Sequence, residues 1–286
     1  MMKKVYILLP VHNRSAVTER FVDCLAAQTY ANYYLILIDD GSTDGTAEMV
    51  QAKIKALTVL NGRGDWWWAG SLQQGINWLE KHGAEGRDIV LFANDDITFD
   101  ADFLQKAVGI LDSLDAALLS PHLRDEKTGL PEESGVEADL QKLTFNEADS
   151  PDKINCLPTR GLFMRMADLR RVGGFHPWLL PHYLSDYEFT IRAHRKGLRL
   201  ITSADIAIQL DREQTGYRSL EHHGFIDFIK RLFSKKYVSN PIYWSTFILL
   251  TVPKSHIPGH LFRLWVSTVK MLFFRSASSL RKQWQK

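Results

Sequence analysis

Short apolar runs alternate with segments of helical spacing along the first 120 residues. The apolar runs have the length of buried strands and lie at 5–10, 34–39, 57–60, 88–93 and 116–120. Segments with the apolar periodicity of a helix lie between them, at 16–28, 43–55, 71–81 and 101–111. Alternating strands and helices are typical of βαβ units. The pattern therefore predicts an α/β fold with a mostly parallel sheet flanked by helices.

The pattern weakens after residue 120 and then returns. Residues 121–155 are mostly polar and predict an excursion or a hairpin. Regular spacing resumes with a strand at 161–165, a helix at 185–196, and strands at 198–202 and 206–210. We expect these elements to complete the same domain.

Polar residues gather where the predicted strands end. They occupy 12–14, 39–42, 62–71 and 94–96. In open α/β sheets, ligands bind outside the carboxyl ends of the strands. The sequence therefore predicts a ligand site at this edge of the sheet.

Three acidic motifs each allow two interpretations when taken alone. Asp40, in DDGSTDGT, could bind a ribose or base, or belong to a turn that opens a helix. Asp95 and Asp96, in NDD, could hold a hard divalent cation or cap the following helix. Asp186, in LSDYEFTIR, could act as a general base, or it could cap its helix or interact favourably with the helix dipole.

The three motifs together, with PVHNR ahead of them and GGF before the last, resemble the family 2 glycosyltransferases of GT-A fold. The resemblance covers residues 4–210 and includes five motifs in order. It implies a metal-dependent, inverting transfer of a sugar from a nucleotide-sugar to an acceptor hydroxyl. Some rhamnosyltransferase-like members carry a similar tryptophan pair.

The resemblance also implies roles for single residues. Asp186 matches the general base, and Asp96 matches the position that binds Mg²⁺ or Mn²⁺ at the donor diphosphate. The positions that match the donor nucleotide site are Pro10, His12, Asn13, Asp40 and Asp95. Many relatives complete the metal site with a histidine after the final strand, where this chain offers Gln209 and Asp211. The third metal ligand is therefore open.

Three consecutive tryptophans stand in the segment GRGDWWWAGS at 62–71. A regular helix or strand would send them to different faces. We therefore expect an irregular, glycine-flanked loop in which Trp68 packs on the following helix. Trp66 or Trp67 would then wall the sugar-binding cleft.

Other cationic side chains near the predicted acceptor site allow two interpretations. His182 lies four residues before Asp186 and could touch the acceptor or a phosphate, although a lone histidine beside aromatics is more often structural. Arg160 and Arg165 flank the strand predicted to run under the acceptor and could pair with a phosphate or be surface charges.

Charge divides the chain near Asp211. Residues 212–286 hold 13 Lys/Arg and 3 Asp/Glu, a balance of +10, whereas residues 1–211 carry −8. The segments 225–237 and 261–274 place aromatic and aliphatic residues opposite basic ones, and the apolar run between them is too short to span a bilayer. We expect a catalytic domain at 1–211 and a basic amphipathic helical tail at 212–286.

The tail predicts peripheral binding to the cytoplasmic face of a membrane and a lipid-linked or surface-polysaccharide acceptor. Its apolar faces could instead pack on the catalytic domain or on a second subunit in a homodimer. Nucleic acid is not expected, because the body is acidic. The apolar run after the first lysines contains Pro10 and predicts a core strand rather than a signal peptide, and the two distant cysteines predict a reducing, cytoplasmic location.

Two other classes of protein share parts of this pattern. A sugar nucleotidyltransferase has a doubly wound domain, but it would carry a glycine-rich phosphate loop directly after the first strand, where LLPVHNRSA has no glycine. A catalytically inactive nucleotide- or carbohydrate-binding protein would not need both Asp96 and Asp186.

Overall fold

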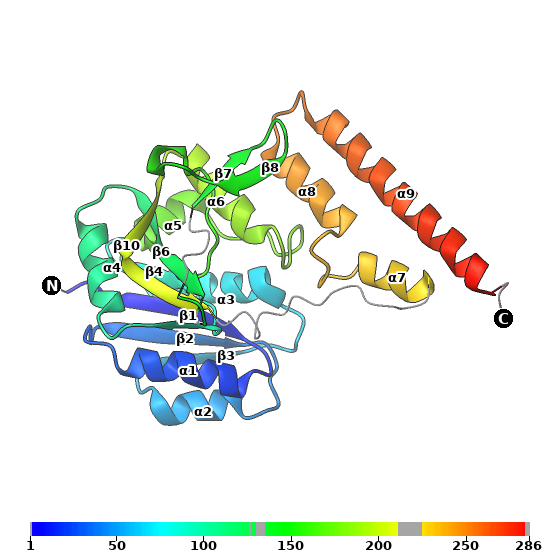
Figure 1. Ribbon diagram of the computed structural model, residues 1–286. Helices are drawn as coiled ribbons and strands as arrows, with labels where there is room; N and C mark the ends of the chain where they lie inside the picture. Colours follow the sequence, from blue (N-terminus) through cyan, green and yellow to red (C-terminus); the bar gives the residue numbers. More distant parts are fainter. Residues whose placement is uncertain (1, 126, 130–134, 211–224, 284–286) are drawn as a thin grey trace.

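An eight-stranded sheet forms the centre of the computed structural model, which describes residues 2–125, 127–129, 135–210 and 225–283 (Figure 1). The strand order is β3-β2-β1-β4-β9-β6-β10-β5. The bounds are β1 Val5–Val11, β2 Tyr33–Asp39, β3 Leu57–Asn61, β4 Ile89–Phe92, β5 Ile97–Phe99, β6 Ala117–Asp125, β9 Leu162–Arg165 and β10 Arg199–Leu210. Strands β3, β2, β1 and β4 are parallel, as are β6 and β10, while β9 and β5 run against their neighbours. The expected α/β fold with a mostly parallel sheet is confirmed.

Helices cover both faces of the sheet. On one side, α1, α2 and α4 contribute to a core with alternate residues of β1, and on the other, α3, α5 and α6 contribute to a second core (Figure 1). Helix α3 approaches closely, since a Cβ at Gly75 would lie 2.9 Å from Leu8 Cδ1. The bounds are α1 Ser15–Ala26, α2 Thr46–Lys53, α3 Trp67–Lys81, α4 Phe103–Asp112, α5 Met166–Val172 and α6 Ser185–Arg195.

Some elements differ from the prediction. Helix α3 begins at Trp67, four residues earlier than expected. The short β5 and α5 were not predicted, and the two strands expected at 198–202 and 206–210 form one strand, β10, whose register shifts between Ser203 and Ala207. The polar segment after residue 120 holds the hairpin of β7 (Val136–Asp139) and β8 (Thr144–Glu147), followed by a 3-10 turn at Pro151–Lys153.

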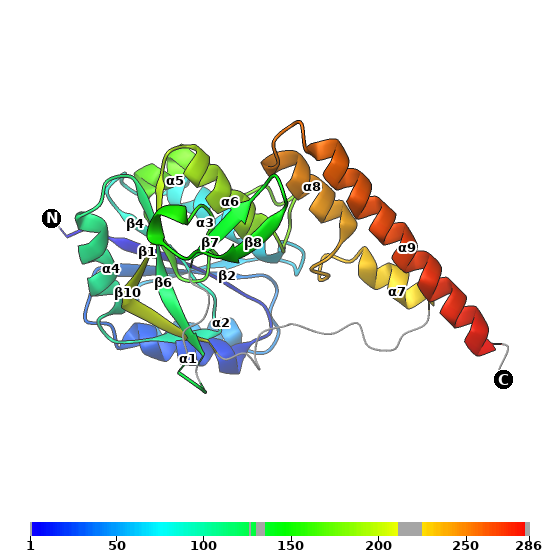
Figure 2. The ribbon, with the colours of Figure 1, turned by 45° about the horizontal axis from the view of Figure 1, so that its top comes forward.

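The described part of the tail forms three helices: α7 Phe225–Leu232, α8 Pro241–Thr251 and α9 Ile257–Gln283. Helix α8 packs on the catalytic domain, because its buried Phe247 shares a cluster with Leu180 and Ile191. Helix α9 leaves the body and projects away from it (Figure 2). The boundary predicted at Asp211 lies outside the described residues. Within them, no helix is both long and apolar enough to cross a membrane.

Candidate active site

Asp40 lies directly after β2 and holds the backbone that follows β3. Its Oδ1 accepts a hydrogen bond from the N–H of Gly64 at 2.8 Å, and its Oδ2 accepts from the N–H groups of Trp66 and Trp67 at 2.9 and 3.1 Å. The carboxylate is buried, so these bonds are shielded from water. Asp40 therefore fixes the turn that opens α3, a long-range contact that the sequence interpretation did not predict.

The tryptophans do not form an irregular loop, and that expectation is wrong. Trp66 precedes α3 directly, and Trp67 and Trp68 belong to its first turn. The rings separate because Trp67 has a left-handed backbone (φ 59°), which breaks the regular progression around the helix. Trp66 and Trp68 pack against the core beneath α3, whereas Trp67 meets the ring of His182 edge-on at 5.9 Å between ring centres.

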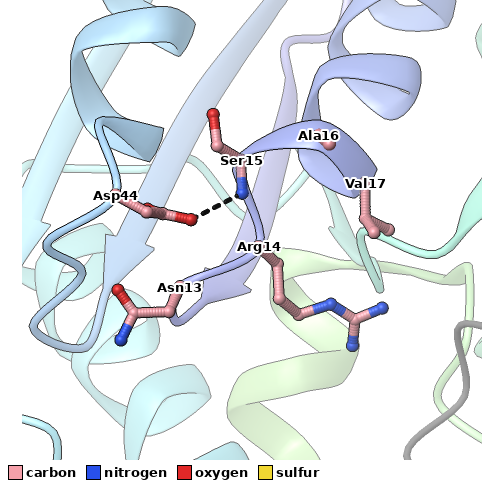
Figure 3. A pocket seen from close by; sticks show the side chains of 6 residues that line it. All are labelled: Asn13, Arg14, Ser15, Ala16, Val17 and Asp44. Atoms are coloured by element: carbon pink, nitrogen blue, oxygen red, sulfur yellow. Dashed lines mark hydrogen bonds between the residues drawn. The ribbon is translucent and has the colours of Figure 1, made fainter.

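Hydrogen bonds join the loop after β1 to the loop after β2. Pro10 itself lies within β1. Asn13 Oδ1 accepts from the N–H of Thr43 at 2.8 Å, and Asp44 accepts from the N–H of Ser15 at 2.9 Å. His12 Nδ1 lies 2.7 Å from the carbonyl oxygen of Asp40. Residues 13–17 and Asp44 line an open pocket. The side chain of Arg14 points away from Asp44 (Figure 3).

Asp95 and Asp96 follow β4 and are both buried. Arg14 lies 3.3 Å from Asp95 Oδ2 and 3.8 Å from Asp96 Oδ2, and the Thr18 hydroxyl donates to Asp95 at 3.0 Å. Burial raises the pKa of Asp95 to about 6, although Arg14 opposes the shift. Arg14 is thus a site residue to which the sequence interpretation gave no role of its own.

Asp96 presents a buried oxygen that could take a cation. Its Oδ1 has no hydrogen-bond partner among the described residues. A buried carboxylate oxygen of this kind is the hard ligand that Mg²⁺ and Mn²⁺ prefer. The described residues hold no group of three metal-ligating side chains, Gln209 is on β10 opposite Thr98, and Asp211 lies outside the described part.

Asp186 lies in the first turn of α6, next to Leu184, which has a left-handed backbone (φ 68°). Its Oδ1 accepts from the N–H of Tyr187 at 2.9 Å. Burial raises the pKa of Asp186, and the nearby positive charge of Arg160 opposes this shift. A carboxylate with a raised pKa is a stronger base than an exposed aspartate.

His182 lies four residues before Asp186 in the chain, and its ring contacts Trp67. Its Nδ1 is buried and has no hydrogen-bond partner among the described residues. Burial, with a smaller contribution from Lys236, lowers the pKa of His182 to about 4, so the ring is neutral at pH 7. The structure thus brings His182 and Trp67 together, as the predicted acceptor cleft requires.

Strained backbone concentrates at this rim. Of the four described residues other than glycine with positive φ, three are Asn13, Trp67 and Leu184. Such conformations cost free energy and persist where the surrounding contacts enforce them, often at functional sites. The loops after β1 and β3 and the start of α6 therefore form one candidate active site.

Arg165 and Glu188 have structural roles. Arg165 donates to the carbonyl oxygens of Leu111 and Leu114, so the alternative in which it meets a phosphate finds no support. Glu188 pairs with Arg192 at 2.8 Å, and Arg192 donates to the carbonyl oxygen of Gly174 at 2.8 Å. This pair holds the GGF turn against α6.

The chain was compared with known proteins. Residues 6–170, more than half of the chain, match the model of glycosyl transferase family 2. No curated protein sequence matches. Among solved structures, residues 1–349 of Staphylococcus aureus TarS with UDP-GlcNAc are 19% identical with a TM-score of 0.60, covering 92% of this chain and 72% of that one.

Two other solved structures share the fold. The mannosyltransferase PcManGT of Pyrobaculum calidifontis, in complex with GDP-Man and Mn²⁺, is 18% identical with a TM-score of 0.57, covering 98% of this chain and 88% of that one. GalNAc-T7 with UDP, GalNAc and Mn²⁺ is 12% identical with a TM-score of 0.63, covering 86% of this chain and 47% of that one. These neighbours identify the curled sheet and its flanking helices as the GT-A fold. By its family match, the chain belongs to glycosyl transferase family 2 and is a glycosyltransferase.

Proposed function

We propose that the protein transfers a sugar from a nucleotide-sugar donor to an acceptor hydroxyl with inversion at the anomeric carbon. The observation that carries this proposal is the position of Asp186, a carboxylate of raised pKa at the start of α6, where the other carboxylate of the first turn, Glu188, is paired with Arg192. One base suffices for a direct displacement, whereas glycoside hydrolysis usually needs two carboxylates. The bound UDP-GlcNAc and GDP-Man of TarS and PcManGT support a nucleotide-sugar donor.

In the proposed reaction, Asp186 takes the proton of the acceptor hydroxyl. The acceptor oxygen then forms a bond to the anomeric carbon, while the bond from that carbon to the nucleoside diphosphate breaks on the opposite face. Asn13 and the loops after β1 and β2 would bind the nucleotide, and Trp67 would wall the sugar. The lowered pKa of His182, about 4, makes its ring a weak proton acceptor, so we assign the base role to Asp186.

Asp96 fits a divalent cation, and its unpartnered Oδ1 would hold it, with Asp95 alongside. When bound, such a cation neutralises the charge that develops on the leaving diphosphate. The Mn²⁺ in PcManGT and GalNAc-T7 supports this assignment. Arg14, which faces both carboxylates, already offsets part of the negative charge of Asp95 and Asp96.

The test is an incubation with a panel of nucleotide-sugars, Mn²⁺ and saccharide acceptors. We expect nucleoside diphosphate release that Asp186→Asn abolishes, and a product whose anomeric configuration, read by NMR, is opposite to that of the donor. Release of pyrophosphate would instead indicate a sugar nucleotidyltransferase. Nucleotide binding without turnover of any donor would indicate an inactive binding protein.

We also infer that the tail docks at a membrane surface, which would suit a lipid-linked acceptor. Helix α9 exposes Phe262, Trp265, Val269 and Phe273, which recur at helical spacing and so share one face. Phe262 is 71% exposed and Val269 61%. The double substitution Phe262→Ser with Val269→Ser should abolish flotation of the protein with anionic liposomes. If flotation is unchanged and the substitutions convert a dimer to a monomer in light scattering, this face binds a second subunit instead.

A further inference from the structure

The segment after α7 brings two lysines of the tail to the rim of the candidate active site. The ammonium nitrogens of Lys235 and Lys236 lie 5.5 and 5.7 Å from the centre of the Trp67 ring. The same ring also contacts His182, on which the charge of Lys236 acts. These two lysines were expected on a basic helix face. In the structure they lie beyond the end of α7, next to the acceptor cleft.

Internal hydrogen bonds fix the segment that carries the lysines. Asn240 Nδ2 donates to the carbonyl oxygen of Ser234 at 3.0 Å, and Asn240 Oδ1 accepts from the N–H of Ile242, which caps α8. The indole N–H of Trp244 donates to the carbonyl oxygen of Val238 at 3.0 Å. Because α8 is packed on the catalytic domain, these bonds hold the lysines in place beside Trp67.

The two lysines have no anionic partner among the described residues. Lys235 and Lys236 make no hydrogen bond or ion pair there; both lie over the Trp67 ring, and the charge of Lys236 acts on His182. Both lysines are exposed. Two adjacent, unpaired ammonium groups attract an anion, and lysine is a usual ligand of phosphate.

We propose that Lys235 and Lys236 form a subsite for a phosphate group of the acceptor, so that the enzyme glycosylates phosphate-bearing acceptors. The proposal rests on the proposed function, because it needs Asp186 to activate the acceptor hydroxyl next to this subsite. The donor diphosphate is expected elsewhere, at Asp96, where Arg14 is already paired. The lysines of the proposed subsite lie instead beside Trp67 and His182.

A binding measurement tests the subsite without turnover. Methyl phosphate serves as the probe, titrated by calorimetry into the full chain with and without saturating nucleoside diphosphate and Mn²⁺. We expect the double variant Lys235→Gln with Lys236→Gln to bind it at least tenfold more weakly, and the affinity of the wild type to persist when the nucleotide is present. Lys55→Gln with Lys81→Gln is the matched control, since it removes the same charge from exposed sites on the catalytic body and should have no effect.

A second measurement compares an octyl saccharide with its phosphodiester-linked counterpart as acceptors. In the Lys235→Gln, Lys236→Gln variant, we expect kcat/KM for the phosphodiester acceptor to fall at least tenfold more than for the neutral one. Trp244→Phe keeps the aromatic ring but loses the bond to Val238. It should shift the same ratio in the same direction by a smaller factor.

Three outcomes would overturn the proposal. Displacement of methyl phosphate by nucleoside diphosphate would assign the cations to the donor. An equal loss in the control variant would show a nonspecific charge effect. A difference between wild type and variant that arises only with anionic vesicles would assign the lysines to lipid headgroups. A failure of the proposed function would be seen separately, as absence of nucleoside diphosphate release from any donor.

Discussion

The carboxylate of Asp40 holds Trp67 by its backbone: Oδ2 accepts the N–H of Trp67 at 3.1 Å and also that of Trp66 at 2.9 Å. With the bond from Gly64, three backbone donors share one buried carboxylate. A carboxylate has about four acceptor positions, so Asp40 has little capacity left for a ligand. Its role in shaping the tryptophan turn is therefore observed, whereas its predicted contact with the donor nucleotide stays a prediction.

Replacing Asp40 by asparagine should destabilise the protein. The substitution removes the charge and points an amide donor at one of the N–H groups, so we expect a loss of about 1–3 kcal/mol in the free energy of unfolding. Urea denaturation measures this loss, and near-UV circular dichroism reports the tryptophan environment. Unchanged stability with lost nucleotide affinity would show that Asp40 is needed to bind the nucleotide and not to hold the turn.

Trp67 and Trp68 should respond differently to truncation. Trp68→Ala removes a ring packed on the core and should cost about 2–4 kcal/mol of stability. Trp67→Ala should cost less than about 1 kcal/mol, because its ring faces His182 and the tail lysines, yet raise KM for donor or acceptor severalfold. Steady-state kinetics and thermal unfolding of both variants provide the comparison. Equal stability losses with unchanged kinetics would make the triplet purely structural.

Gly62 should not tolerate a side chain. A Cβ there would clash with Asp40 Oδ1 and lie 2.8 Å from Trp66 Cε3. We expect Gly62→Ala to lower the free energy of unfolding by about 1–3 kcal/mol. Gly109→Ala is the control, since a Cβ at that position on α4 meets no atom within 4 Å. It should be neutral or stabilise by about 0.5–1 kcal/mol, and chemical denaturation distinguishes the two variants.

His182 should make stability depend on pH in the acid range. Its pKa in the folded protein is about 4, below the usual 6.5, so the unfolded chain takes up a proton first as the pH falls. The contribution of neutral His182 to the free energy of unfolding is thus complete above pH 6.5. It decreases by up to about 3 kcal/mol as the pH falls from 6.5 to 4. The free energy of unfolding of the wild type relative to His182→Gln should decline over this window in urea titrations. A constant difference would show that His182 titrates normally.

Periodicity predicted the alternating strands and helices because βαβ units bury long, regular apolar faces. It missed β5 and α5, which span only three and seven residues and carry too few positions for a pattern. The triple tryptophan was misjudged because a single left-handed residue, Trp67, redirects the rings within a helix start. The acidic motifs mark residues that the structure gathers at one rim.

Long-range contacts at the site could not be inferred from local spacing. Arg14 meets Asp95 and Asp96 only because the loops after β1 and β4 adjoin in the sheet. Lys235 and Lys236 reach Trp67 only because α8 packs on the catalytic domain. Both arrangements depend on tertiary packing that no window of sequence contains.

The packing of α8 joins the tail to the catalytic domain through a shared apolar cluster. Phe247 is fully buried against residues from both the β7 region and α6, including Val136 and Ile191. Removing the tail would expose the apolar residues around Phe247 to water. It would also remove the lysines that lie beside Trp67. The chain cut at residue 211 is therefore expected to melt at a lower temperature than the whole protein. We accordingly expect the smallest autonomous enzyme to extend at least through α8.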